Sequence, residues 1–145
     1  MKTLLASLAL ALCASAAHAT TLATCGASHG YAIFHQGGLV TADLASKDWV
    51  DDAITGGTIK LGQDDQGNPD IRVRDATGVD FSYLADGATV RFLFNDGSTY
   101  VVFAMFPKAD IEIFTFSPGK VTWTQQKFGP QQVVTKTAAY LADCK

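Results

Sequence analysis

The chain has 145 residues, of which 10% are aromatic and 17% are charged, and its net charge is −3. A mildly acidic chain with scattered Lys and Arg lacks the basic surface of a nucleic-acid-binding protein, and this length suits one domain with a real core. Thirteen of the fourteen acidic residues are Asp, which favours turns, whereas Glu favours helices. The composition therefore favours β-structure and excludes nucleic acid as a partner.

The first 19 residues have the pattern of a secretory signal peptide. Lys2 supplies the positive start, and Leu4 to Leu12 form an apolar core that is too short to span a bilayer. Ala17-His18-Ala19 is a small-x-small cleavage site. We expect cleavage after Ala19, a single β-rich domain over residues 20–145, and a periplasmic or secreted protein without a membrane span.

Two cysteines remain after the predicted cleavage, Cys25 and Cys144. They lie near opposite ends of the predicted mature chain, and export would carry both into an oxidising compartment. The sequence predicts a disulfide that closes the domain. A free, reactive Cys25 is the weaker alternative, because it leaves Cys144 unexplained.

The segment Gly26-Ala-Ser28-His29-Gly30 matches the G-x-S-x-G pattern of the nucleophile elbow. That elbow needs a preceding strand, a following helix and distant Asp and His partners, which this N-terminal segment lacks. A glycine-rich entry to the first strand, Tyr31 to His35, is the better interpretation. We expect no catalytic residue here.

His29 and His35 share a strand parity, so both imidazoles could lie on one face. They are weak candidates for metal ligands, because a zinc site usually needs three or four protein ligands. A nearby Asp would have to supply another, and solvated histidines are more common. We expect no cofactor.

The segment from Thr41 to Ile54 is the least strand-like part of the chain. Ser46 is a candidate cap of a short helical turn, and Trp49 is the expected anchor of the segment. Thr58 to Leu61 then reads as a short strand. The acidic loop Gln63 to Asp70 does not have EF-hand spacing, so we interpret it as a hairpin loop.

Turn residues after this loop fix the register of several hairpins. Asp86-Gly87 and Asp96-Gly97 suit two-residue type I′ turns, and Pro118-Gly119 suits a type II turn. Ala76-Thr77-Gly78 reads as a three-residue loop. The predicted pairs are Val73 with Phe81, Ile71 with Tyr83, Tyr83 with Val90, Phe92 with Val101, Phe114 with Trp123 and Phe116 with Val121.

These registers place most large apolar residues on one face, which we expect to be the inner face of the sheet. Arg74 opposite Asp80 predicts a cross-strand ion pair on the other face. Glu112 is the one exception on the inner face. The predicted inner set is Ile71, Val73, Val79, Phe81, Tyr83, Val90, Phe92, Phe94, Val101, Phe103, Met105, Phe114, Phe116, Val121 and Trp123.

The end of the chain completes the predicted fold. Gln131 to Thr137 reads as a last strand and Lys136 to Leu141 as a helical turn before Cys144. The fold class is all-β: an antiparallel up-and-down meander of about eight or nine strands that forms a small barrel or sandwich, with at most one or two short helical turns. In size this resembles the small barrels of lipocalins. Lys47-Asp48-Trp49 stands in place of their G-x-W motif, so the resemblance implies architecture alone.

The same registers leave an apolar patch on the outer face, where a meander should be polar. One interpretation is a cover by the chain itself, either by Thr41–Ile54 with Trp49 or by a turn at Ala138–Leu141. The other is a surface for a partner or a homodimer. The candidate binding residues are Tyr100, Val102, Phe106, Ile111, Ile113 and Leu93.

The sequence thus favours an exported, non-catalytic protein that binds an unknown protein partner through its outer sheet surface. A lipocalin-like carrier of a small apolar ligand is the alternative. A hydrolase that uses Ser28, or a metal enzyme that uses His29 and His35, is the least supported reading, because the chain lacks clustered titratable groups.

Overall fold

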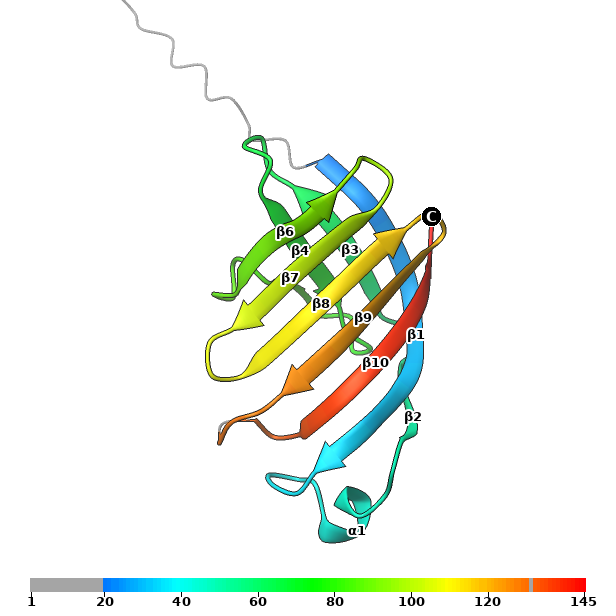
Figure 1. Cartoon of the computed structure of the whole chain (residues 1–145), viewed down its shortest axis with the longest axis vertical. Coiled ribbons are helices and arrows are strands. Elements are labelled where there is room, and N and C mark those ends of the chain that lie inside the picture. Colours follow the sequence, from blue (N-terminus) through cyan, green and yellow to red (C-terminus); the bar gives the residue numbers. More distant parts are fainter. Residues whose placement is uncertain (1–19, 131) are drawn as a thin grey trace, which may run out of the picture.

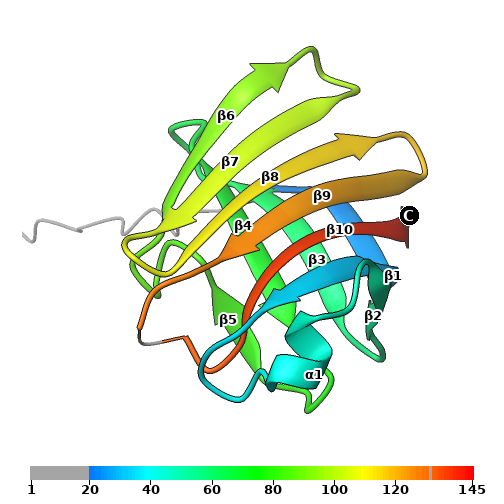
Figure 2. The same cartoon turned by 60° about the horizontal axis from the view of Figure 1, so that its bottom comes forward.

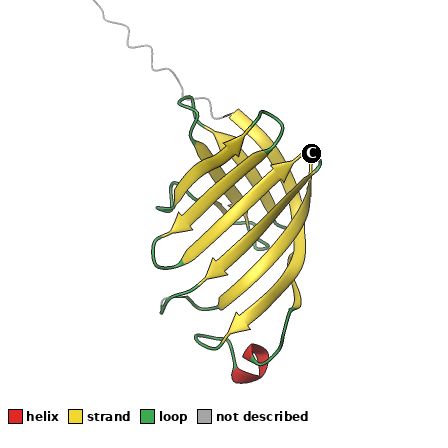
Figure 3. Cartoon of the chain, in the orientation of Figure 1, coloured by secondary structure: helices red, strands yellow, loops and turns green. Residues whose placement is uncertain are grey.

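The computed structural model describes residues 20–130 and 132–145, so the predicted signal peptide lies outside the described residues. These residues form ten strands and one short helix, α1 (Figure 3). The predicted all-β fold class is confirmed. The elements are β1 (Thr20–His35), α1 (Ala42–Ala45), β2 (Val50–Ile54), β3 (Thr58–Gln63), β4 (Pro69–Arg74), β5 (Asp80–Ser82), β6 (Thr89–Asn95), β7 (Tyr100–Phe106), β8 (Asp110–Ser117), β9 (Lys120–Lys127) and β10 (Thr135–Cys144).

The strands form one antiparallel sheet in the order β5-β4-β3-β1-β10-β9-β8-β7-β6, and β2 pairs with β1 beside this path. Neighbours along this path are neighbours in the chain, except where β1 meets β10 and where β1 meets β3. The sheet curls into a half-barrel, in which β6–β10 form one wall and β3 and β4 cross behind it (Figures 1 and 2). Among the described residues, no helix is long and apolar enough to cross a membrane.

Strand β1 joins the two ends of the meander. Its first part pairs with β3, its later part pairs with β2, and β10 runs along its other side. Cys25 lies directly opposite Cys144 in this ladder, and the two form the predicted disulfide. The bond links the first strand to the last, and it is consistent with an extracellular or periplasmic protein.

Two of the predicted hairpins are confirmed. In the β4–β5 hairpin, Val73 pairs with Phe81, and the predicted Arg74–Asp80 ion pair forms at 2.6 Å. In the β8–β9 hairpin, Phe114 pairs with Trp123 as expected. Both loops have the glycine conformation that their turn type requires, since Gly78 and Gly119 have positive φ angles.

The predicted β6–β7 register is wrong. Asp96 does not sit in a two-residue turn, because its carboxylate accepts hydrogen bonds from the backbone N–H groups of Ser98 and Thr99 and so organises a longer loop. A bulge at Leu93 then adds one residue. Phe92 therefore pairs with Val102 rather than Val101, and the inner and outer sets of β7 are exchanged.

The predicted Asp86-Gly87 hairpin does not form. The segment turns instead with helix-like hydrogen bonds, from Asp86 N–H to the Ser82 carbonyl and from Ala88 N–H to the Tyr83 carbonyl. As a result, β5 pairs only with β4 and β6 only with β7. The two ends of the sheet are left unpaired with each other, which is why the barrel is only half closed.

Three local predictions are also wrong. Thr41, not Ser46, caps the helix, because its hydroxyl accepts from Leu44 N–H, and Ser46 lies at the C-terminal end. Trp49 is not a buried anchor of its segment, since its side chain is 53% exposed. Val50–Ile54, in the segment expected to be the least strand-like part of the chain, is a strand. The segment predicted as a helical turn, Lys136–Leu141, belongs to strand β10, because it pairs on both sides, with β1 and with β9.

The core fills the concave side of the sheet. It combines large aromatic side chains, which stack in the series Phe116, Phe114, Trp123 and Tyr140, with small residues on neighbouring strands. The largest fully buried side chains are Phe114, Phe116, Leu61, Ile71, Val102 and Val121. An interior of this width can be filled by side chains alone, which leaves little room for a large ligand.

Candidate functional site

The interior becomes polar toward one end of the half-barrel. Phe114 and Trp123 pair across β8 and β9, and the next inward-facing pair along the same strands is Glu112 with Gln125. Asp110 follows, opposite Lys127. The strand alternation that fills the core with aromatic residues therefore also brings two acidic residues, spaced two apart, into the interior.

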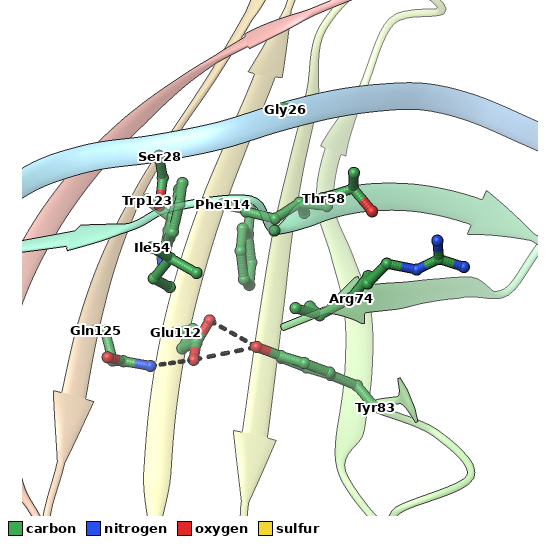
Figure 4. Close-up of a pocket in the computed structure, with 13 residues that line it drawn as sticks. Gly26, Ser28, Ile54, Thr58, Arg74, Tyr83, Glu112, Phe114, Trp123 and Gln125 are labelled. Atoms are coloured by element: carbon green, nitrogen blue, oxygen red, sulfur yellow. Dashed lines mark hydrogen bonds between the residues drawn. The ribbon is translucent and has the colours of Figure 1, made fainter. Parts of the chain in front are cut away.

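Glu112 is the centre of a buried polar cluster (Figure 4). Its side chain is only 2% exposed. Gln125 Nε2 donates to Glu112 Oε1 at 2.5 Å, and the Tyr83 hydroxyl lies 3.2 Å from both carboxylate oxygens. Gln125 Nε2 also donates to Asp110 Oδ2 at 3.1 Å. One amide thus bridges the two acidic side chains.

The surroundings of this cluster change its protonation. Burial, together with the charge of Asp110, raises the pKa of Glu112 to about 8. Burial also raises the pKa of Asp110, against the opposing hydrogen bond with Glu112 and the attraction of Lys127. Burial and the charge of Glu112 hold the pKa of Tyr83 well above its ordinary value. Glu112 therefore keeps its proton to a higher pH than an exposed glutamate does.

A small cavity of about 40 Å³ adjoins this cluster. Glu112, Gln125 and Tyr83 line one side of it, and Ser28 faces it from β1 (Figure 4). Ser28 is 5% exposed, and its hydroxyl has no hydrogen-bond partner among the described residues. The cavity has room for one or two water molecules or a small polar group.

A second polar cluster lies on the neighbouring inner strands. Asp52 of β2 accepts hydrogen bonds of 2.6 Å from Lys136 Nζ and from the Tyr140 hydroxyl, both on β10. Burial would raise the pKa of Asp52, but these two donors outweigh it and lower the pKa overall. Because every charge in this cluster has a partner, we interpret the cluster as a structural link that holds β2 against β10.

The convex face of the sheet is apolar and uncovered. Ile113 is 40% exposed in the middle of the face, and no described segment lies over β7–β10 in the view of Figure 1. We call this surface the outer apolar face. Its apolar members are Tyr31, Val101, Phe103, Met105, Ile111, Ile113 and Leu141.

A groove of about 470 Å³ crosses the outer apolar face. Its base includes Ala139 and Thr124, which are directly paired, and Tyr31 and Ile113 flank them in the same row across the strands. Gly30, which pairs with Tyr140, also lines the groove. It allows β1 and β10 to pack closely, because a Cβ atom there would lie 2.0 Å from the Ala139 carbonyl oxygen.

The predicted binding residues divide between the two faces. Ile111 and Ile113 lie on the outer apolar face as expected, and Leu93 is 60% exposed at the β6 bulge. Val102 is fully buried in the core, and Tyr100 and Phe106 pack against that core. The exchange of faces in β7 explains the split. Neither predicted cover of the outer face forms in the described part of the chain, because Trp49 is exposed and Ala138–Leu141 lies within β10.

The other predicted sites can now be placed. Ser28 lies within strand β1 rather than on a strand-to-helix elbow. His29 and His35 lie on the outer side of the same strand, and His35 Nε2 is 3.0 Å from the Thr137 hydroxyl. Within residues 20–130 and 132–145, no group of three or more His, Cys, Asp or Glu side chains is placed to hold a metal ion.

No family model matches the chain, and neither the curated proteins nor the solved structures give a match. The fold and the two candidate sites define the class: a small curled-sheet protein with a disulfide between its first and last strands, a polar interior cluster and an apolar outer face.

Proposed function

We propose that this chain is an exported, non-catalytic binding protein that recognises a protein partner through its outer apolar face. The observation that carries the proposal is the outer apolar face, whose apolar residues come from β7, β8, β10 and β1, with a groove that crosses the threonine-bearing strand β9 between them. A contiguous exposed apolar surface usually marks an interaction site. The disulfide and the predicted signal peptide together support export to the periplasm or the medium.

The shape of the groove favours a protein over a small molecule. Sites for small ligands enclose most of the ligand surface, whereas this groove is open along the convex face of a sheet. Its apolar walls, formed by Tyr31 and Ile113, are combined with the hydroxyl groups of Thr115, Thr122 and Thr124. Such a surface fits bulky apolar side chains of a partner, with hydrogen bonds at the margin.

The alternative, a carrier of a small apolar ligand, is less well supported. The interior cavity of about 40 Å³ is far below the volume of ordinary ligand pockets, and acidic and amide groups line one side of it. An apolar ligand would bury those groups without partners, which is unfavourable.

Photo-crosslinking tests the proposal in the native exported fraction. Benzoylphenylalanine in place of Thr124, on the base of the groove, should give one discrete crosslinked species, and Ile113→Lys should abolish it. The matched control is Leu39→Lys, which changes another exposed apolar residue, 75% exposed and away from the groove. A crosslink that persists with Ile113→Lys, or that is lost equally with Leu39→Lys, would refute the proposal. A crosslinked dimer of the chain itself would identify a second copy as the occupant.

A further inference from the structure

The interior cavity is a second site, independent of the outer apolar face. It lies where β1 changes partners, because β1 pairs with β3 up to Cys25 and with β2 from Ser28 onward. Gly26 and Thr58 line the cavity beside this change of partners (Figure 4). Gly57 lines it as well. The irregularity in the ladder between Cys25 and Ser28 leaves a gap that regular pairing would close.

The polar groups of the cavity are short of donors. The Ser28 hydroxyl has no hydrogen-bond partner among the described residues, although the residue is 95% buried. Glu112 accepts hydrogen bonds only from the neutral groups of Gln125 and Tyr83 in that part of the chain. Buried polar groups normally find partners, so an unpartnered hydroxyl beside a carboxyl group points to a ligand that brings donors.

The acidic groups at the cavity also favour a ligand that brings hydrogen-bond donors. Asp110 lies two residues before Glu112 on the same face of β8 and is also buried. One of its carboxylate oxygens has no hydrogen-bond partner among the described residues. Lys127 faces Asp110 across the ladder, but Glu112 has no cationic side chain among its described hydrogen-bond partners. The buried side of the cavity therefore has a carboxyl group without a cationic partner, and a positive ligand complements its ionised form.

The remaining walls are mainly aromatic and apolar, together with Thr58 and Arg74, whose guanidinium group donates to Asp80. Phe114 and Trp123 stack with their ring centroids 5.7 Å apart, and both line the cavity. Aromatic faces attract ammonium groups and also exclude water from them. The volume of about 40 Å³ limits the ligand to a few non-hydrogen atoms.

We propose that this cavity binds a small organic ammonium ion, whose N–H groups donate to Glu112 and whose second polar group meets the Ser28 hydroxyl. Ethanolammonium, with four non-hydrogen atoms, is the probe that matches this arrangement. n-Propylammonium lacks its hydroxyl group, and ethylene glycol lacks its charge. The three molecules have similar sizes, so differences in their affinities report the two contacts separately.

Tryptophan fluorescence gives a direct assay. The sequence contains two tryptophans, Trp49 and Trp123. A Trp49→Phe background leaves Trp123, which lines the cavity, as the sole reporter. At pH 8, ethanolammonium should change its emission with a saturable dependence at concentrations up to about 10 mM. Its affinity should exceed those of n-propylammonium and ethylene glycol by about tenfold each.

Two variants assign the contacts. Glu112→Gln should weaken ethanolammonium binding at least about tenfold. Ser28→Ala should abolish the preference for ethanolammonium over n-propylammonium and leave the affinity for n-propylammonium unchanged. Asp65→Asn, which alters an exposed acid in the β3–β4 loop, is the matched control and should bind normally. Circular dichroism and the melting temperature establish that each variant is folded.

Several outcomes would overturn the proposal. One is the absence of a saturable change with ethanolammonium. Others are equal binding of ethylene glycol and undiminished binding by a folded Glu112→Gln variant. Stronger displacement of the signal by Ca²⁺ or Mg²⁺ than by ethanolammonium would mean that the cavity is a metal site, and it would also refute the ammonium assignment.

Discussion

Glu112 makes the stability of this protein depend on pH in a defined direction. Its pKa is about 8 in the folded protein, against an ordinary value of 4.5. Between these two values the folded state binds a proton that the unfolded chain releases, so unfolding becomes more favourable as the pH rises. The stabilisation is fully present below about pH 4.5, and it is lost progressively toward pH 8.

The size of the effect follows from the same difference. At about 1.4 kcal/mol per pKa unit, the rise from 4.5 to about 8 corresponds to a loss on the order of 5 kcal/mol. Asp110 titrates together with Glu112, so this energy belongs to the pair rather than to one residue. Glu112 is 2% exposed, so solvent screens the interaction little. A loss of this size is a large part of the total stability of a small domain.

Glu112→Gln isolates this contribution. Glutamine has nearly the same shape and stays neutral, so the variant should match the wild type within about 1 kcal/mol at pH 5 and exceed it by several kcal/mol at pH 9. Urea unfolding at pH 5, 6, 7, 8 and 9, with the disulfide intact, measures both proteins. Asp65→Asn serves as the control and should follow the wild type at every pH. Parallel pH profiles for Glu112→Gln and the wild type would refute the assignment of the proton to the buried pair.

The remaining predictions concern the framework. Replacing Cys25 and Cys144 with Ala should lower the free energy of unfolding by roughly 4–5 kcal/mol, because the bond closes a loop across 119 residues, and urea unfolding measures it. Gly30→Ala should lower the melting temperature strongly, because its Cβ would lie 2.0 Å from a backbone oxygen of β10; an unchanged melting temperature would contradict that packing. Val102→Lys should abolish cooperative unfolding, because it buries an unpaired charge. Phe103→Lys, on the outer apolar face, should leave the protein folded. If instead Phe103→Lys unfolds the protein and Val102→Lys does not, the β6–β7 register predicted from Asp96-Gly97 is the correct one.

The parts of the fold that the sequence predicts correctly depend on short-range turn chemistry. Pro118-Gly119 admits one compact turn, so the pairing of Phe114 with Trp123 follows from it. Asp96-Gly97 admits more than one loop, because the Asp side chain can accept several backbone hydrogen bonds and stabilise a longer one. Nothing in the dipeptide itself distinguishes the two cases.

Other errors arise because tertiary context overrides local preference. The residues from Ala138 to Leu141 favour a helix by propensity, yet they form a central strand paired on both sides. Their small side chains fit this position, because Ala138 and Ala142 lie in the interior beside the large rings of Trp123 and Tyr140. The gain from two ladders and the disulfide exceeds the small difference in propensity.

The interior site could be predicted only in part. Glu112 is visible in the sequence as the one exception in the predicted inner set, and Asp110 precedes it on the same face of β8. Its partners are not, since Gln125 lies 13 residues away and Tyr83 lies 29 residues away. The role of Ser28 depends on the change of partners along β1, which leaves no mark in the sequence beyond the nearby glycine.

The faces of β7 are distinguished by volume rather than by hydrophobicity. Both of its alternating sets are apolar, so the period-2 pattern alone cannot say which set faces inward. The concave side of a curled sheet offers less space than the convex side, and the rings of Phe114 and Trp123 already occupy it. At the centre of β7 the small residues Val102 and Ala104 face these rings, and the larger Phe103 between them faces the convex side. Tyr100 and Phe106 reach the core only at the two ends of the strand. Packing to the usual interior density at the centre of β7 thus places Phe103 on the convex side, as part of the outer apolar face.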